Sequence, residues 1–278
     1  MPKHLKVLKT SARIKLALGC LILLFGLTLF SYLIQFIQGL NAPISGNSTN
    51  REYQWDGEFN LNILIGLSST SLISLNPISQ TITILEIEDQ TYAEVQDPAF
   101  KQQIEESFGL PVDVFLSVNS FEGSTKQFLE NVKSNPFTLS YIFKEATTNL
   151  TPMELIKMWS LIRSVRSDKI NALSVSLDLP QDGVDNIIKD KFSEDKISLE
   201  GATIAVYNST DKSGLAASAA RVIKNLGGDV IIVSTTKGDF TKNLVSGDDN
   251  LKTSKRLKQL FAPECLRQSC DILDKSFS

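Results

Sequence analysis

The most constraining feature of this sequence is a long uncharged segment near its N-terminus. Residues 16–38 read "LALGCLILLFGLTLFSYLIQFIQ" and contain no Asp, Glu, Lys or Arg. A bilayer core about 30 Å thick is crossed by about 20 apolar residues in a helix. The segment is also too long for a cleaved signal peptide, and no small-residue cleavage site follows it closely. We therefore predict a transmembrane helix over residues 16–38.

The charges that flank this helix predict its orientation. Residues 1–15 carry five basic side chains and no acidic one, and the next basic residue is Arg51. Because positive charge is retained on the cytoplasmic side, residues 1–15 are expected to form a cytoplasmic tail. Residues 39–58 are polar with Pro and Gly, and we interpret them as a linker. The expected localisation is a single-pass membrane protein with its bulk outside the cytoplasm.

The composition of the exterior part excludes several functions. Five of the 28 Lys and Arg precede residue 16, which leaves 23 against 31 Asp and Glu, a net charge of −8. An acidic surface argues against a nucleic-acid partner, because phosphates bind basic faces. The only histidine is His4, in the predicted tail. Catalysis by a Ser-His or Cys-His pair is therefore excluded outside the membrane.

Two cysteines, Cys265 and Cys270, lie in the exterior part. In an oxidising compartment they could form a disulfide that closes a small loop. A helix running through both would point their side chains too far apart to bridge. Two cysteines without histidine do not form a zinc site, so we predict no metal and no cofactor.

The pattern from residue 59 to residue 180 predicts an α/β domain with a mixed sheet. Three short strands, "FNLNILIGLS", "TSLISLNP" and "TITILEIE", are expected to form a meander. Pro98 and Gly109 delimit a predicted helix, and "VDVFLSV" and "NALSVSLDLP" are further strands. Between those strands Thr151, Pro152 and Glu154 predict the start of a helix.

The last part of the chain predicts a small second module. Residues 181–200 are charged and irregular, and we interpret them as a linker. Residues 201–278 begin with a strand, a helix and a strand, "ATIAVYN", "SGLAASAARVIKNLGG" and "DVIIVSTT". A crossover of this length predicts parallel strands, hence a βαβ module. "CDILDKSF" is a candidate last strand.

Three carboxylates, Glu86, Glu88 and Asp89, lie at the end of the third predicted strand. They could form a catalytic cluster, hold a divalent cation, or be the solvated end of a strand. In a strand, Glu86 and Glu88 share a face and Asp89 points the other way. That geometry favours a solvated strand end.

Two stretches of the chain resemble the LytR-CpsA-Psr family of cell-envelope proteins. "NILIGLSSTSLISLNPISQTITILEIEDQT" and "FGLPVDVFLSV" are similar to that family's domain, and "VYNSTDKSGLAASAARVIKNLGGDVIIV" is similar to the LytR C-terminal domain. The resemblance implies that active members of this family transfer glycopolymers from a polyprenyl pyrophosphate to peptidoglycan. It also implies that they use an Asp, several Arg and magnesium for this reaction.

The sequence departs from this family at the expected catalytic positions. Only Gly66–Thr70 separates the first two predicted strands, so the loop that carries the Asp and the first Arg is missing. Where the family has "RDT", this chain has Glu88-Asp89-Gln90-Thr91. Three carboxylates would repel a pyrophosphate, which needs cations and donors. We therefore interpret Glu86, Glu88 and Asp89 as a vestigial site and predict no catalytic residue.

Two functions follow from the resemblance. The first is a membrane-anchored, non-catalytic module that binds an envelope glycopolymer or a protein partner during envelope assembly. The alternative is an active phosphotransferase with a rebuilt site, for which Arg163 and Arg166 are the arginines to locate.

Overall fold

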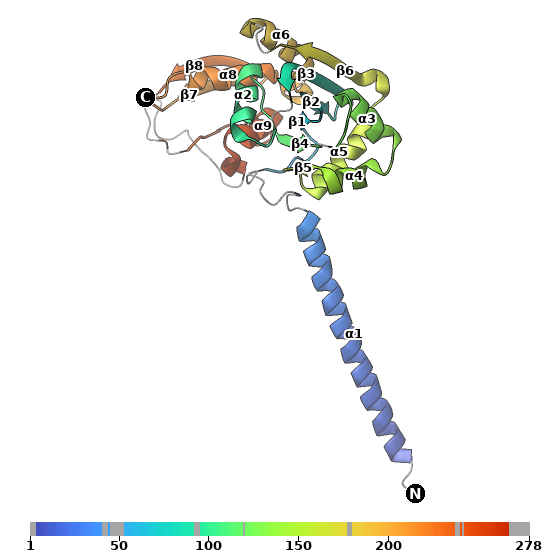
Figure 1. Cartoon of the computed structure of the whole chain (residues 1–278). Helices are drawn as coiled ribbons and strands as arrows, with labels where there is room; N and C mark the ends of the chain where they lie inside the picture. Colours follow the sequence, from blue (N-terminus) through green and yellow to red (C-terminus); the bar gives the residue numbers. More distant parts are fainter. Residues whose placement is uncertain are drawn as a thin grey trace. The chain divides into compact units, whose positions relative to one another are not determined.

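A computed structural model describes residues 4–40, 44, 53–91, 95–118, 120–176, 180–236, 240 and 242–266 (Figure 1). The chain divides into two compact units, of which one is built on the helix α1 (His4–Leu40). Within α1, residues Ala17–Gln35 have a mean hydropathy of 2.3, and their side chains are not buried. The predicted apolar helix is confirmed, and it begins earlier than expected, at His4. Its length and composition are sufficient to cross a membrane.

The second unit is organised around a six-stranded mixed sheet with the order β5-β4-β1-β2-β3-β6. Strand β2 is antiparallel to β1 and β3, while β4 is parallel to β1 and β6 is parallel to β3. The β1-β2-β3 meander confirms the expected arrangement of the first three strands. The strands are β1 (Leu61–Gly66), β2 (Ser69–Asn76), β3 (Thr81–Thr91), β4 (Val114–Ser117), β5 (Thr147–Thr148) and β6 (Ile170–Val175).

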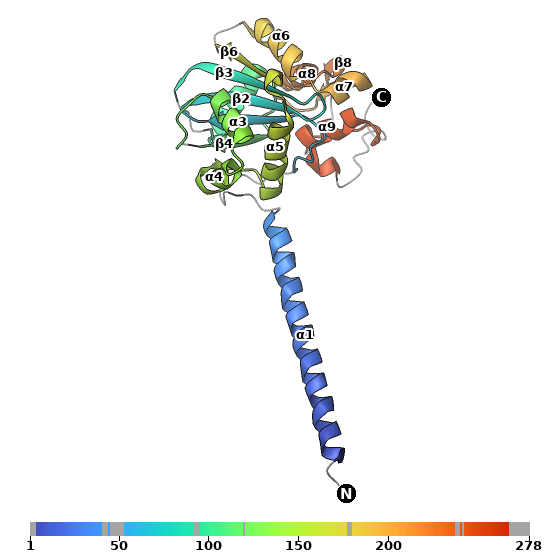
Figure 2. The same cartoon turned by 90° about the vertical axis from the view of Figure 1, so that its right-hand side faces the viewer.

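Helices cover both faces of this sheet, as Figure 2 shows. On one face, Ile63 and Ile65 of β1 belong to a core shared with α3, α4 and α5. On the other face, Leu64 belongs to a core shared with α2, α6 and α7. All six residues of β1 are therefore buried, as expected for a strand covered on both faces. The helices are α2 (Pro98–Phe108), α3 (Thr125–Ser134), α4 (Thr138–Glu145), α5 (Pro152–Ser164), α6 (Gln181–Phe192) and α7 (Asp195–Glu200).

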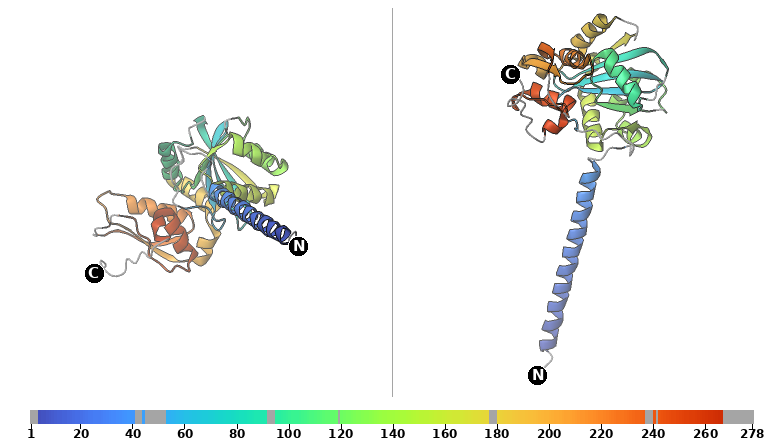
Figure 3. Two further views of the ribbon diagram at one scale, coloured as in Figure 1. Left: turned by 90° about the horizontal axis from the view of Figure 1, so that it is seen from below. Right: turned by 90° about the vertical axis from the view of Figure 1, so that its left-hand side faces the viewer.

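The C-terminal module contains a second sheet of two parallel strands, which confirms the predicted βαβ unit. Strand β7 (Thr203–Asn208) and strand β8 (Asp229–Thr235) are joined by α8 (Leu215–Asn225). Helix α9 (Lys252–Phe261) and a short 3₁₀ helix (Pro263–Leu266) complete the described part of the module, which is orange to red in Figure 3. The candidate strand 270–277 lies outside the described residues.

Two sequence-based boundaries are wrong. Residues 181–200 are not an irregular linker but the helices α6 and α7, because Val184, Ile188, Phe192 and Ile197 bury an apolar face in the core. Strand β3 does not end at Glu88, the last residue of the predicted strand "TITILEIE", but continues to Thr91.

Candidate functional site

The first candidate site is the carboxyl edge of the main sheet. The pairing makes β1, β3, β4 and β6 parallel to one another, so their C-terminal ends lie at the same edge. Open α/β sheets bind ligands at this edge, just beyond the strand ends. Gly66, Ser117 and Val175 end three of these strands, and Glu86, midway along β3, is level with Ser174, the next-to-last residue of β6. The predicted acidic cluster is therefore at the edge where a ligand would be expected.

Glu86 has a defined position on this edge. It is half-buried and level with Ser71 of β2 and Ser174 of β6. The hydroxyls of Ser71 and Thr125 are 2.9 Å apart, and Thr125 is the first residue of α3. A helix N-terminus attracts negative charge through its dipole and free amides. The carboxylate of Glu86 thus lies on the sheet face that α3 covers, at the level of the N-terminus of that helix.

The other two carboxylates of the cluster lie on the same strand. Glu88 and Asp89 are residues of β3 and do not follow it, but their side chains are outside the described part of the chain. Among the side chains that are described, no group of three His, Cys, Asp or Glu could hold a metal ion. The expectation that Glu86, Glu88 and Asp89 form a vestigial site remains a prediction.

Arg163 and Arg166 lie at the opposite edge of the sheet. Arg163 is the next-to-last residue of α5 and stacks on Trp159, with its guanidinium carbon 4.7 Å from the ring centroid. Arg166 is exposed and pairs with Asp168 at 3.0 Å. The chain then enters β6 at Ile170, opposite Ile82 of β3. Glu86 lies four residue steps beyond Ile82 along β3, which is about 13 Å at about 3.3 Å per residue.

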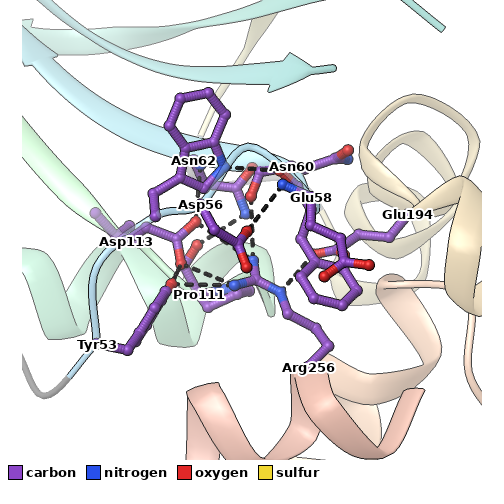
Figure 4. A network of polar contacts seen from close by, with 12 residues as sticks. Tyr53, Asp56, Glu58, Asn60, Asn62, Pro111, Asp113, Glu194 and Arg256 are labelled. Atoms are coloured by element: carbon purple, nitrogen blue, oxygen red, sulfur yellow. Dashed lines mark hydrogen bonds and ion pairs between the residues drawn. The ribbon is translucent and has the colours of Figure 1, made fainter. Parts of the chain in front are cut away.

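The second candidate site is a buried arginine that joins the C-terminal module to the main sheet (Figure 4). Arg256 of α9 is fully buried. Its guanidinium donates to Glu194 at 2.7 Å, to the hydroxyl of Tyr53 at 3.0 Å and to the carbonyl of Asn60 at 3.3 Å. It also pairs with Asp113 at 3.4 Å. A planar guanidinium with five donors suits such a cluster of acceptors.

This arginine cluster contains more negative than positive charge. Asp113 also accepts hydrogen bonds from the Tyr53 hydroxyl and from the backbone N–H of Asn62. Burial raises the pKa of Glu194 to about 7, and Arg256 offsets only part of that effect. Burial and the neighbouring Asp113 also raise the pKa of Tyr53, so the phenol stays protonated. The cluster is therefore arranged to hold one guanidinium and to take up a proton on Glu194 near neutral pH.

A lysine-rich shell lies at the edge of the arginine cluster. Glu58, which precedes β1, is paired with Lys252 at 2.7 Å, with Lys196 at 3.0 Å and with Lys255. Hydrogen bonds from Lys252 and Lys255 lower the pKa of Glu58 to about 2. Because Lys252 and Lys255 belong to α9, this acid also holds the C-terminal module against the segment before β1.

A separate polar contact joins the module to the end of α2. Arg221 of α8 pairs with Asp185 at 2.7 Å and donates to the carbonyls of Glu106 and Ser107 at 2.6 and 2.9 Å. The last carbonyls of a helix have no partner within the helix, so these donors cap α2. Gly109 follows with φ 56°, and a Cβ there would lie 2.7 Å from the side-chain nitrogen of Asn225. The left-handed turn and the close contact both require glycine.

The structure describes two of the three cysteines. Cys265 is buried and disulfide-bonded, whereas Cys20 is free. Cys270 lies outside the described residues, so the Cys265–Cys270 pairing stays a prediction.

Sequence reasoning missed the arginine cluster completely. In "NLKTSKRLKQLF" Arg256 is one of four basic residues, and arginine is rarely buried unless it is paired. Its partners Asn60, Asp113 and Glu194 come from three distant segments of the chain. No local sequence pattern could therefore predict that they contact Arg256. The one available signal was the isolated aspartate before the strand "VFLS".

Comparisons with known proteins do not assign the chain to a family. No family model matches it, and no curated protein matches it. Solved structures similar to it include TagT of B. subtilis, with 12% identity and a TM-score of 0.33 over 54% of this chain and 97% of TagT. TagV of B. subtilis has 10% identity and a TM-score of 0.34 over 62% and 98% of the two chains. A transcriptional regulator from Enterococcus faecalis has 11% identity and a TM-score of 0.30 over 73% and 95%. Likenesses this weak carry no argument about activity.

Proposed function

We propose that this chain is a membrane-anchored LytR-CpsA-Psr-like protein that acts outside the cytoplasm in cell-envelope assembly, as a binding or scaffolding module without glycopolymer transfer. Its partner is an envelope glycopolymer or another envelope protein. The sequence resemblance to the family's two domains and the apolar helix α1 support the anchoring and the family part of this proposal.

The observation that carries the non-catalytic part is the separation of Glu86 from the described arginines. Transfer from a pyrophosphate requires fixed cations or a metal where negative charge develops. Glu86 places a carboxylate near the carboxyl edge of the sheet, whereas Arg163 and Arg166 precede the start of β6 at Ile170. Ile170 is paired with Ile82, which lies about 13 Å from Glu86 along β3.

The remaining described arginines of the second unit are occupied elsewhere. Arg221 caps α2, and Arg256 is enclosed by its acidic partners. Removing a single positioned donor from a transfer site costs about a hundredfold or more in rate. A site that lacks all four described arginines is expected to give no measurable transfer.

The experiment uses the full chain in lipid vesicles with a polyprenyl-pyrophosphate glycan, peptidoglycan and magnesium. An active family member in a parallel reaction shows that the substrate is competent. We expect no glycan transfer above the protein-free background. Transfer that is lost in the Arg163→Ala variant and kept in the matched Lys157→Ala variant, on the same helix, would show that the site is rebuilt and not lost.

A further inference from the structure

A cavity of about 250 Å³ opens between α3 and α4, which lie side by side in the second unit (Figure 1 and Figure 2). It is separate from the two sites described above. A pocket that holds a drug-sized ligand has roughly 300–1,000 Å³, so this smaller cavity suits a single ring. Six of the residues that line it have aromatic or amide side chains: Phe121, Phe128, Asn131, Asn135, Phe137 and Tyr141.

The sequence places these side chains along two helices that follow each other in the chain. Phe128, Asn131 and Asn135 are three and four residues apart, so they follow one face of α3 to its C-cap. Phe137, the N-cap of α4, and Tyr141 are four residues apart and share a face of α4. The cavity therefore lies between one stripe of each helix.

Aromatic rings form the apolar part of the cavity. Phe121 and Phe128 meet edge to face with their ring centroids 5.2 Å apart, and Phe128 is buried. Phe137 is 78% exposed, so most of its ring is accessible to a ligand. The face of an aromatic ring carries partial negative charge, which attracts C–H groups that lie flat against it.

Side-chain amides form the polar part of the cavity. The side-chain oxygen of Asn135 accepts the backbone N–H of Phe137 at 2.9 Å, which orients the amide and leaves its two N–H donors for a ligand. The side chain of Asn131 makes no hydrogen bond to the residues that the structure describes. The hydroxyls of Tyr141 and Ser120 are 2.6 Å apart. The two amides can therefore exchange hydrogen bonds with the hydroxyls of a neutral ligand.

The charge of the cavity narrows the class of ligand further. None of the described residues that line it is charged, and the nearby Lys133 donates instead to the hydroxyl of Ser167 at 2.9 Å. An anionic ligand such as a pyrophosphate needs cations and finds none among them. A purely apolar chain would cover the amides without hydrogen-bonding to them, which costs free energy. The ligand that fits is neutral, with one apolar face and a polar edge.

We propose that this cavity binds one neutral sugar ring of a glycan. A pyranose presents C–H groups on its face and hydroxyls around its edge. Phe137 contacts the C–H face, and Asn131 and Asn135 hydrogen-bond to the hydroxyls. The inference rests on the proposed function and deepens it, because it selects an envelope glycan over a protein as the partner.

The affinity of a single site is expected to be low. One ring contributes few atoms, so we expect a Kd on the order of 1 mM. A glycan carries many rings, and copies anchored in one membrane through α1 can bind several of them at once. Weak binding at each site is therefore sufficient to hold a polymer.

The test is fluorine NMR of the full chain in lipid nanodiscs, with para-fluorophenylalanine in place of Phe137. The control carries the same label at Phe143 of α4, which is 36% exposed and does not line the cavity. The probes are two neutral trisaccharides, chitotriose and maltotriose, and the anionic trigalacturonic acid.

We expect a neutral trisaccharide to shift the resonance at position 137, with half-saturation at about 1 mM, and to leave the resonance at position 143 unchanged. Trigalacturonic acid should bind about fivefold more weakly or not at all, because the cavity offers no cation.

Substitutions test the two kinds of contact, with binding followed by saturation-transfer NMR of the trisaccharide. Phe137→Ala should weaken binding about tenfold, whereas Phe143→Ala on the same helix should leave the affinity unchanged. Asn131→Ala should weaken binding about fivefold by removing hydrogen bonds to the sugar. Alanine favours the helix, so α3 is retained in this variant.

Several results would overturn the proposal. These are equal shifts at positions 137 and 143, equal losses from Phe137→Ala and Phe143→Ala, tighter binding of the anionic trisaccharide, or no shift with either neutral one. Farnesol that shifts the resonance at position 137 where the sugars do not would assign the cavity to an apolar chain.

Failure of this site and failure of the proposed function give different results. Glycan transfer in the vesicle assay would refute the non-catalytic function and leave the sugar site standing. Absence of sugar binding without glycan transfer would refute the sugar site and leave a protein as the partner.

Discussion

Removing the guanidinium from the arginine cluster should destabilise the protein severely. Arg256→Met keeps an unbranched side chain of similar length but leaves Asp113 and Glu194 buried without a cation. Breaking a buried ion pair by removing one partner costs about 3–5 kcal/mol. For a folded unit of about 200 residues, 1 kcal/mol corresponds to about 2–4 °C, so the melting temperature should fall by about 6–20 °C.

The assay is thermal unfolding of the full chain in detergent micelles, followed by tryptophan fluorescence. Trp55 is 3% exposed and donates to the carbonyl of Phe59 at 2.8 Å, so its emission reports on this region. The matched control is Arg166→Met, which removes an exposed pair worth about 0–1 kcal/mol. Equal losses of stability from the two variants would refute the conclusion that Arg256 compensates the buried charges of the arginine cluster.

A compensated variant separates charge from packing. Adding Asp113→Asn and Glu194→Gln to Arg256→Met removes both uncompensated carboxylates and should recover part of the lost stability. If the triple variant is no more stable than Arg256→Met, the loss arises from packing and not from buried charge.

Three further predictions concern the pH dependence of stability, the contact of Arg221 with the end of α2, and the cysteines. Because burial raises the folded-state pKa of Glu194 from 4.5 to about 7, its contribution is fully present below pH 4.5 and is lost as the pH rises through 7. Urea unfolding should show stability falling by at most about 3 kcal/mol across that window, and Glu194→Gln should flatten the fall; an unchanged slope would contradict the shift. Arg221→Ala should cost about 2 kcal/mol in urea unfolding by leaving Asp185 and the carbonyls of α2 without their donor, and a cost no larger than that of Arg166→Ala would refute the cap. Cys265 and Cys270 should resist thiol labelling without reductant, and labelling of both in the native protein would refute the disulfide.

The sequence predicted local structure well where one pattern dominated a segment. The β1-β2-β3 meander, the helix between Pro98 and Gly109 and the βαβ module all carry strong periodicity and clear end signals. The helix predicted to start at Thr151, Pro152 and Glu154 is α5, which buries Leu155, Met158 and Ile162 on one face.

Segments stabilised by distant contacts were not predictable. Residues 181–200 look irregular because charged residues outnumber apolar ones, and only the sheet and α8 reveal which face is buried. The arginine cluster is the extreme case, because burial of Arg256 depends on Asn60, Asp113 and Glu194, which the sequence separates widely. Pairing of buried charges is a tertiary property, and neither spacing nor propensity encodes it.

The measurement that tests the proposed function most directly is the location of the C-terminus relative to the membrane. An envelope polymer can reach the second unit only if that unit lies outside the cytoplasm, as the five basic residues before Leu16 predict. Alkaline phosphatase and a cytoplasmically fluorescent protein, each fused after Ser278, report opposite sides. We predict an active phosphatase and a dark fluorescent fusion. A fluorescent fusion with an inactive phosphatase would place the chain in the cytoplasm and contradict a role in envelope assembly.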